Sequence, residues 1–187
     1  GYAFNSDGSL DIGAAAKYVF TGRALGAPNL ANRNAILALL KKSISPTGAL
    51  AMSAGNVFDY SWTILALKAN NESAVAQKVA TKLASLARTD GGFGFDATIS
   101  TTESSTDATG IALQALATAT SNAATAADAL KRRTIVAATA YLSRTVVGGN
   151  HWQAWGDYDT NGTAYAAMGL AAAGRSVSPI RKWLASK

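Results

Sequence analysis

Aspartate side chains stand where three small-residue helices of this sequence are expected to begin. Asp59, Asp107 and Asp159 each precede a run of small and apolar residues. The partial positive charge at a helix N-terminus stabilises a carboxylate there by about 0.3–1 kcal/mol. The same position also suits the rim of a ligand cavity. The sequence leaves both interpretations of these acids open, capping and ligand binding.

Aromatic residues accompany these acids. Most follow glycine turns, and two others open an earlier helix. Concave aromatic surfaces with a few polar groups are the usual form of small-molecule sites. We therefore predict a binding site, with no catalytic residue assigned, that contains Tyr60, Trp62, Asp107, Trp152, Tyr158 and Asp159. Phe93, Phe95 and Trp155 are instead expected to fill space between neighbouring helical units.

The segment from Asp157 to Gly162 matches the first six positions of an EF-hand calcium loop. The twelfth position is Met168, which cannot supply the bidentate carboxylate of such a loop. Asp157, Asp159 and Asn161 are thus only a partial calcium-site candidate. Cysteine is absent, which excludes a thiolate zinc site and a cysteine nucleophile. The sequence identifies no cofactor.

Turns, acids and helices recur together along the chain. Aligning the small-residue helices places Thr63, Thr109 and Thr163 in one column, and a weaker first copy surrounds Gly13. The period is about 50 residues, which indicates an array of units that each bury their apolar face against a neighbour.

Each unit is expected to contain a buried helix followed by a half-exposed one. The segment 59–70 is apolar or small on nearly every side, whereas 73–88 carries a single stripe of Val75, Val79 and Leu83. The predicted helices span residues 11–21, 31–43, 59–70, 73–88, 106–118, 124–144 and 161–173, with a further start at 178. We expect an all-α protein with no sheet beyond a two-stranded ribbon. We expect it to form one domain over residues 1–187 that is excised from a longer chain.

The net charge of +6 does not indicate nucleic-acid binding. Most bases, Lys131 and Arg132 among them, fall in the second helices, where they are expected to form a solvated outer face. No aromatic or glycine-rich element lies among them, as nucleic-acid surfaces require. No run approaches the roughly 18 apolar residues of a membrane span, and residues 1–9 lack the regions of a signal peptide. We expect neither nucleic-acid binding nor membrane insertion.

Three stretches carry a family resemblance: DGGFGF at 90–95, STDATGIALQALA at 105–117 and DYDTNGTAYAAMGLAAAG at 157–174. They resemble the repeats of the terpenoid cyclase and protein prenyltransferase superfamily. The likeness is greatest to its bacterial secreted or cell-surface branch, which is related to the helical domain of cobalamin carriers. The resemblance implies an alpha/alpha toroid-like array of about four helical hairpins, partial or open, and an extracellular or cell-surface location.

The departures from this family affect catalysis. Class II cyclases protonate their substrate with an Asp-x-Asp-Asp-Thr-Ala motif. When its Thr-Ala is aligned on Thr163 and Ala164, only the first of its three acids, Asp159, remains. The prenyltransferase zinc site requires a cysteine. We therefore expect a non-catalytic ligand-binding or adhesion module of an extracellular bacterial protein, with a small molecule or glycan bound on the concave face at the N-terminal ends of the buried helices. Neighbouring domains of a longer chain are further expected partners.

The alternative is an enzyme of the terpenoid-cyclase or carbohydrate-active type. Its acids would be Glu103, Asp107 and Asp159, since polysaccharide-cleaving enzymes act through paired carboxylates. An acidic rim favours ligands that carry positive charge or many hydroxyl groups over anions such as prenyl diphosphates.

The assignment of buried and half-exposed helices is testable by substitution. Leu113→Ala should lower the free energy of unfolding by about 2–5 kcal/mol, because it removes a large buried side chain. Lys82→Ala, on a half-exposed helix, should change it by less than about 0.5 kcal/mol. Urea denaturation of both variants measures the difference, and equal effects would show that the two helix types are exchanged.

Overall fold

The computed structural model describes residues 3–27, 32–51, 56–96 and 104–187. Its helices are α1 (Ile12–Ala24), α2 (Arg33–Lys42), α3 (Val57–Ala69), α4 (Ser73–Ala84), α5 (Thr106–Ala119), α6 (Ala126–Thr145), α7 (Thr160–Ala172) and α8 (Ser178–Ala185). Strands β1 (Gln153–Ala154) and β2 (Asp157–Tyr158) form the one sheet of the described part. The expected all-α character is therefore confirmed, and no sheet in the described residues exceeds a two-stranded ribbon. None of the described helices is long and apolar enough to cross a membrane.

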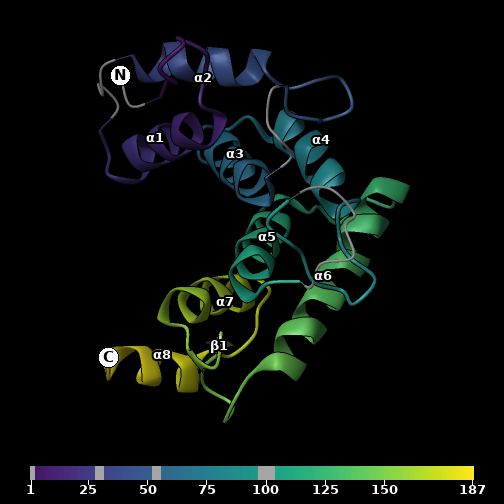
Figure 1. The fold of residues 1–187 in the computed structure, drawn as a ribbon. Coiled ribbons are helices and arrows are strands. Elements are labelled where there is room, and N and C mark those ends of the chain that lie inside the picture. Colours follow the sequence, from purple (N-terminus) through teal and green to yellow (C-terminus); the bar gives the residue numbers. More distant parts are fainter. Residues whose placement is uncertain (1–2, 28–31, 52–55, 97–103) are drawn as a thin grey trace.

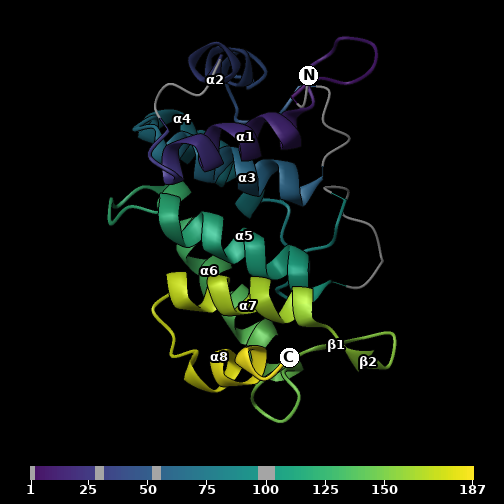
Figure 2. The same ribbon diagram turned by 90° about the vertical axis from the view of Figure 1, so that its left-hand side faces the viewer.

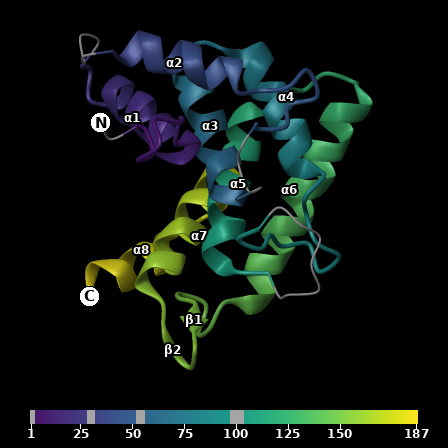
Figure 3. The ribbon, with the colours of Figure 1, turned by 45° about the horizontal axis from the view of Figure 1, so that its top comes forward.

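The odd-numbered helices α1, α3, α5 and α7 form a row, here called the inner row. Each packs on the next, and Figure 2 shows them side by side. Helices α2, α4 and α6 pack on the inner-row helices that precede them, and α4 and α6 lie on the convex side of the row (Figure 1). Figure 3 shows the two chain ends near opposite ends of the row.

The amino-acid composition of the helices explains why some lie in the inner row and others pack outside it. In α5 the side chains of Ile111, Leu113 and Leu116 are all completely buried, as expected for a helix with neighbours on most sides. Helix α4 buries Val79 and Leu83 but exposes Lys78. The predicted alternation of buried and half-exposed helices is present.

Four turns with one hydrogen-bond pattern connect to the inner row, and we call them the repeat turns. They span residues 5–9, 45–49, 88–92 and 147–151. In each, the amide of the first residue donates to the carbonyl of the fifth over 2.8–2.9 Å, and the amide of the fourth donates back to the first over 2.9–3.2 Å. Gly8, Gly48 and Gly91 occupy the fourth position with positive φ, which side chains rarely adopt.

The residue that follows a repeat turn is tied to the inner helix of its unit. The amides of Leu50, Phe93 and Trp152 donate to Tyr60 Oη at 3.3 Å, Thr109 Oγ1 at 2.9 Å and Thr163 Oγ1 at 3.0 Å, respectively. These three acceptors are each the fourth residue of their helix.

The counterpart of Thr109 and Thr163 is therefore Tyr60, and the predicted alignment with Thr63 is wrong. The interiors of these helices consist of small residues, and a shift of the alignment by three residues leaves the same helix face buried, so the composition does not fix the register. The side-chain hydroxyl of Thr63 is buried and has no hydrogen bond within the described part of the chain.

Side chains cap every inner-row helix at its N-terminus. Asp11, Asn56, Ser105 and Asp159 accept hydrogen bonds from the backbone amides of Ala14, Phe58, Ala108 and Gly162 over 2.8–3.3 Å. Such caps contribute about 0.5–2 kcal/mol each and fix where a helix begins.

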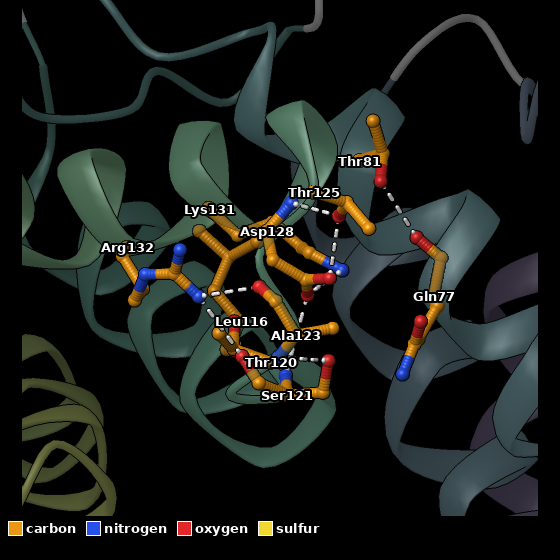
Figure 4. A network of polar contacts seen from close by, with 10 residues as sticks. All are labelled: Gln77, Thr81, Leu116, Thr120, Ser121, Ala123, Thr125, Asp128, Lys131 and Arg132. Carbon is orange, nitrogen blue, oxygen red and sulfur yellow. Dashed lines mark hydrogen bonds and ion pairs between the residues drawn. The ribbon is translucent and has the colours of Figure 1, made fainter.

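A buried ion pair anchors the N-terminus of α6 (Figure 4). Asp128 accepts hydrogen bonds from the Thr125 hydroxyl at 2.7 Å and from Lys131 Nζ at 3.0 Å. Lys131 is only 1% exposed, so the expectation that the bases of the second helices form a solvated face is wrong for this residue. Arg132 instead donates to the carbonyls of Ser121 and Ala123 and holds the preceding loop against α6.

This pair makes the folded protein sensitive to acid. The Thr125 hydroxyl and then the Lys131 ammonium hold the pKa of Asp128 well below its ordinary value. The contribution of the carboxylate to stability is therefore complete above the unfolded-state pKa of about 3.9 and is lost as the pH falls below it.

Asp128→Asn should lower the melting temperature at neutral pH, and the gap to the unsubstituted protein should narrow below pH 4 in thermal melts. A gap that stays constant into acid would contradict this role.

Helices α5 and α7 approach closely through glycine. A Cβ atom on Gly110 would collide with the backbone of Tyr165 and Ala166, and one on Gly169 with the backbone of Gly110. Backbone at this spacing cannot give way as a flexible side chain can.

We expect Gly110→Ala to destabilise the protein by about 1–3 kcal/mol because of overpacking, although Ala has the higher helix propensity. Thr118→Ala, an exposed position of the same helix, is the control and should not destabilise. Denaturant unfolding measures both, and stabilisation by Gly110→Ala would show that the two helices do not approach this closely.

Candidate functional site

A pocket of about 680 Å³ lies at the N-terminal ends of α5 and α7. Its volume falls within the range of about 300–1,000 Å³ that is usual for small-molecule sites. Five described parts of the chain line it: Phe95 after the turn 88–92, the start of α5 with the residues before it, the start of α7, the C-terminal half of α6, and the β1–β2 hairpin with the residue before it. The described lining residues are Phe95, Ser104, Ser105, Thr106, Asp107, Tyr141, Thr145, Trp152, Gln153, Ala154, Trp155, Asp159 and Asn161.

The two carboxylates of the pocket are held by capping hydrogen bonds. Asp107 Oδ1 accepts from the Ala108 amide at 2.9 Å and from the Ser105 hydroxyl at 2.6 Å. Asp159 Oδ1 accepts from the Gly162 amide at 2.8 Å. In the described residues no hydrogen bond or ion pair uses Oδ2 of either acid, and Oδ2 of Asp159 lies against Gly162 at the start of α7.

The negative charge of Asp107 also acts on a neighbour in α7. Burial, with a smaller contribution from the Asp107 charge, raises the pKa of the Tyr165 phenol above its ordinary value. The phenol therefore stays neutral at physiological pH. The ring of Phe58 packs edge-on against Tyr165 at 5.6 Å.

The β1–β2 hairpin and the residue before it contain one buried and one exposed tryptophan. Trp152 is 1% exposed, and its indole Nε1 donates to Thr145 Oγ1 at 3.0 Å. Trp155 and Gly156 form the two-residue loop between β1 and β2, with φ of 51° and 86°, the positive values that a type I′ turn requires. The Trp155 side chain at this tip is completely exposed.

Two further rings line the pocket. Phe95 is 55% exposed, and its ring stacks on Phe58 with 5.7 Å between centroids. The Tyr141 hydroxyl donates to the Ser104 carbonyl at 2.7 Å, and the Arg144 guanidinium lies over its ring. The remaining polar groups come from the amides Gln153 and Asn161 and from hydroxyl side chains. The described lining contains no Lys, Arg or His.

The pocket unites three of the six predicted site residues: Asp107, Trp152 and Asp159. Tyr60 lies apart in the core, where its hydroxyl accepts the Leu50 amide. Trp62 packs on Phe20 with 5.7 Å between ring centroids.

Tyr158 lies against the C-terminal helix and does not line the pocket. Its ring contacts Trp183 edge-on at 5.7 Å, and Lys187 Nζ lies over it at 4.2 Å. Ligand binding by any of the six residues stays a prediction.

Three of the lining aromatic residues, Phe95, Tyr141 and Trp155, are not among the predicted site residues. Phe95 and Trp155 were expected to fill space between units, yet both are exposed, whereas Phe93 is buried as expected. The Trp-Gly pair between short polar segments is a signal for a tight hairpin, and it would have placed Trp155 at a tip. Tyr141 lies in a half-exposed helix and carried no sequence signal.

The calcium hypothesis is not tested by the geometry. Asp157 and Asp159 each use Oδ1 to accept a backbone amide, from Tyr158 and Gly162. Within the described residues no group of three or more His, Cys, Asp or Glu side chains is placed to hold a metal ion. Glu103, an acid of the enzyme alternative, lies outside the described residues.

No protein-family model matches this chain, and no curated protein matches it. Function is therefore inferred from the side chains of the pocket.

Proposed function

We propose that the protein is a non-catalytic ligand-binding module, with its ligand in the pocket between the N-terminal ends of α5 and α7. The observation that carries the proposal is the meeting of Asp107, Asp159 and the exposed Trp155 in one pocket. A concave pocket lined by aromatic side chains and a few convergent polar groups is the usual form of a small-molecule site. Rigid capping of both acids prepares the site for binding, because little order is lost when a ligand enters.

The proposal extends to the arrangement of the inner row as a whole. We infer that the curved inner row is an open part of an alpha/alpha toroid like that of the terpenoid cyclase and prenyltransferase superfamily. The four repeat turns and the close packing between successive inner-row helices support this inference. The resemblance also suggests an extracellular or cell-surface location for the module.

A hydrolase is the second candidate function. The observation that favours it is that Asp107 and Asp159 line the same pocket, since most glycosidases use two carboxyl groups that flank the bond they cleave. Both acids also serve as helix-terminal hydrogen-bond acceptors, which explains their presence without catalysis. Cleavage of a bound glycan that is abolished by Asp107→Asn would favour the enzyme.

Blocking the pocket tests the proposed site without assuming a ligand class. Asn161 lies at the start of α7 and lines the pocket, and its neighbour Thr160 is equally exposed but does not. Ligands that bind the folded state raise the melting temperature. A thermal-shift screen should therefore find a stabilising probe among cyanocobalamin, neutral oligosaccharides, farnesol, tetramethylammonium and calcium chloride.

Asn161→Trp should weaken binding of that probe by about tenfold or more, because the new ring fills the pocket. Thr160→Trp is the matched control and should bind as the unsubstituted protein does. Calorimetric titration gives the affinities. A probe that binds Asn161→Trp normally would place the site elsewhere, and the absence of any stabilising probe would overturn the proposed function.

A further inference from the structure

The pocket offers one unobstructed aromatic ring beside several planar polar groups. Trp155 supplies the ring, and the carboxylates of Asp107 and Asp159 and the amides of Gln153 and Asn161 supply the polar groups. From this combination we infer that the ligand is an uncharged saccharide. The inference rests on the proposed function and names the ligand class of that same pocket.

The position of Trp155 suits stacking on a sugar ring. Its side chain is completely exposed, although burying a tryptophan is strongly favourable. The type I′ turn and the pairing of Ala154 with Asp157 hold it at the hairpin tip. The face of an indole ring is electron-rich and attracts the weakly positive C–H groups that a pyranose presents on its apolar face.

The polar groups suit the edge of the same sugar. An amide is planar and carries a donor and an acceptor at the spacing of neighbouring hydroxyl groups, so Gln153 or Asn161 can bond two of them. Asp107 and Asp159 are fixed through Oδ1 by capping bonds and can add an acceptor for a single hydroxyl group. Gln153 and Asn161 are exposed and add both donors and acceptors.

Other ligand classes fit the pocket less well. An anion would face two carboxylates and, in the described lining, no Lys or Arg. An isoprenoid would desolvate the acids and amides without bonding them, at a cost of about 2–7 kcal/mol for each polar group by transfer scales.

A cation cage needs several open ring faces around one point. In this pocket Phe95 is stacked on Phe58, Tyr141 lies under Arg144, and Trp152 is buried. The Trp155 ring is the one that remains fully open among the described lining residues. A single ring plus hydrogen-bonding edges matches a saccharide better than a quaternary amine.

The experiment separates the ring from the hairpin that carries it. Trp155→Asn creates an Asn-Gly pair, the strongest sequence for a type I′ turn, so it removes the ring while favouring the hairpin. Trp155→Tyr keeps an aromatic face. Val136→Asn replaces an exposed apolar side chain of α6 that does not line the pocket and serves as the control. The probes are neutral oligosaccharides of glucose, mannose, galactose, xylose and N-acetylglucosamine, with tetramethylammonium and farnesol as the competing classes.

At least one neutral oligosaccharide should bind, and Trp155→Asn should weaken it about tenfold or more, a loss of about 1.4 kcal/mol. Trp155→Tyr should stay within about threefold of the unsubstituted protein, and Val136→Asn should match it. The affinity should not change with ionic strength, because the ligand carries no charge.

Two results would overturn the inference: no neutral oligosaccharide binds, or one binds equally well to Trp155→Asn. If tetramethylammonium or farnesol binds instead, and Asn161→Trp weakens that binding, the saccharide assignment fails and the proposed site remains. If Asn161→Trp leaves binding of every probe unchanged, both the assignment and the proposed function fail.

Discussion

A buried hydrogen bond from the residue after a repeat turn to its inner helix, present in three of the four described units, is the constraint on which the rest of this fold depends. The amides of Phe93 and Trp152 have no access to water, and Thr109 and Thr163 supply the acceptors. A buried amide left unpaired would cost about 1–3 kcal/mol. The carbonyls of Phe93 and Trp152 accept in return from the amides of Ser105 and Asp159, the N-caps of α5 and α7. Each turn is thereby fixed against the first turn of its helix.

The pocket follows from this constraint together with the glycine contact between α5 and α7. The contact of Gly110 with the backbone of α7 brings the two helix starts close together. The fixed turn before α7 then carries the β1–β2 hairpin to the edge of the space between them. The pocket therefore forms from residues that also have structural roles: acids that accept hydrogen bonds at helix starts, and an aromatic residue at a hairpin tip.

The sequence predicted the helices and their alternation because apolar periodicity is a local property. It predicted the acids at the helix starts for the same reason, since capping depends on a few neighbouring residues. It did not predict which aromatic residues share a pocket. Tyr60 replaces threonine as the acceptor for a turn amide, and this exchange depends on the exact register between units. Lys131 is buried in an ion pair with Asp128, which no periodicity of α6 reveals.

The stepwise packing of the inner row has a consequence for how the chain unfolds. Helix α1 packs on α2 and α3, and α7 packs on α5 and α8, so the units interact chiefly with their neighbours in sequence. In arrays of this kind stability is close to a sum of unit and interface terms, and opening starts at an end. The α1–α2 end can open while α5 and α7 stay in contact. Because the glycine contact holds α5 directly against the backbone of α7, we expect the two helices that bear the pocket to open together rather than one at a time.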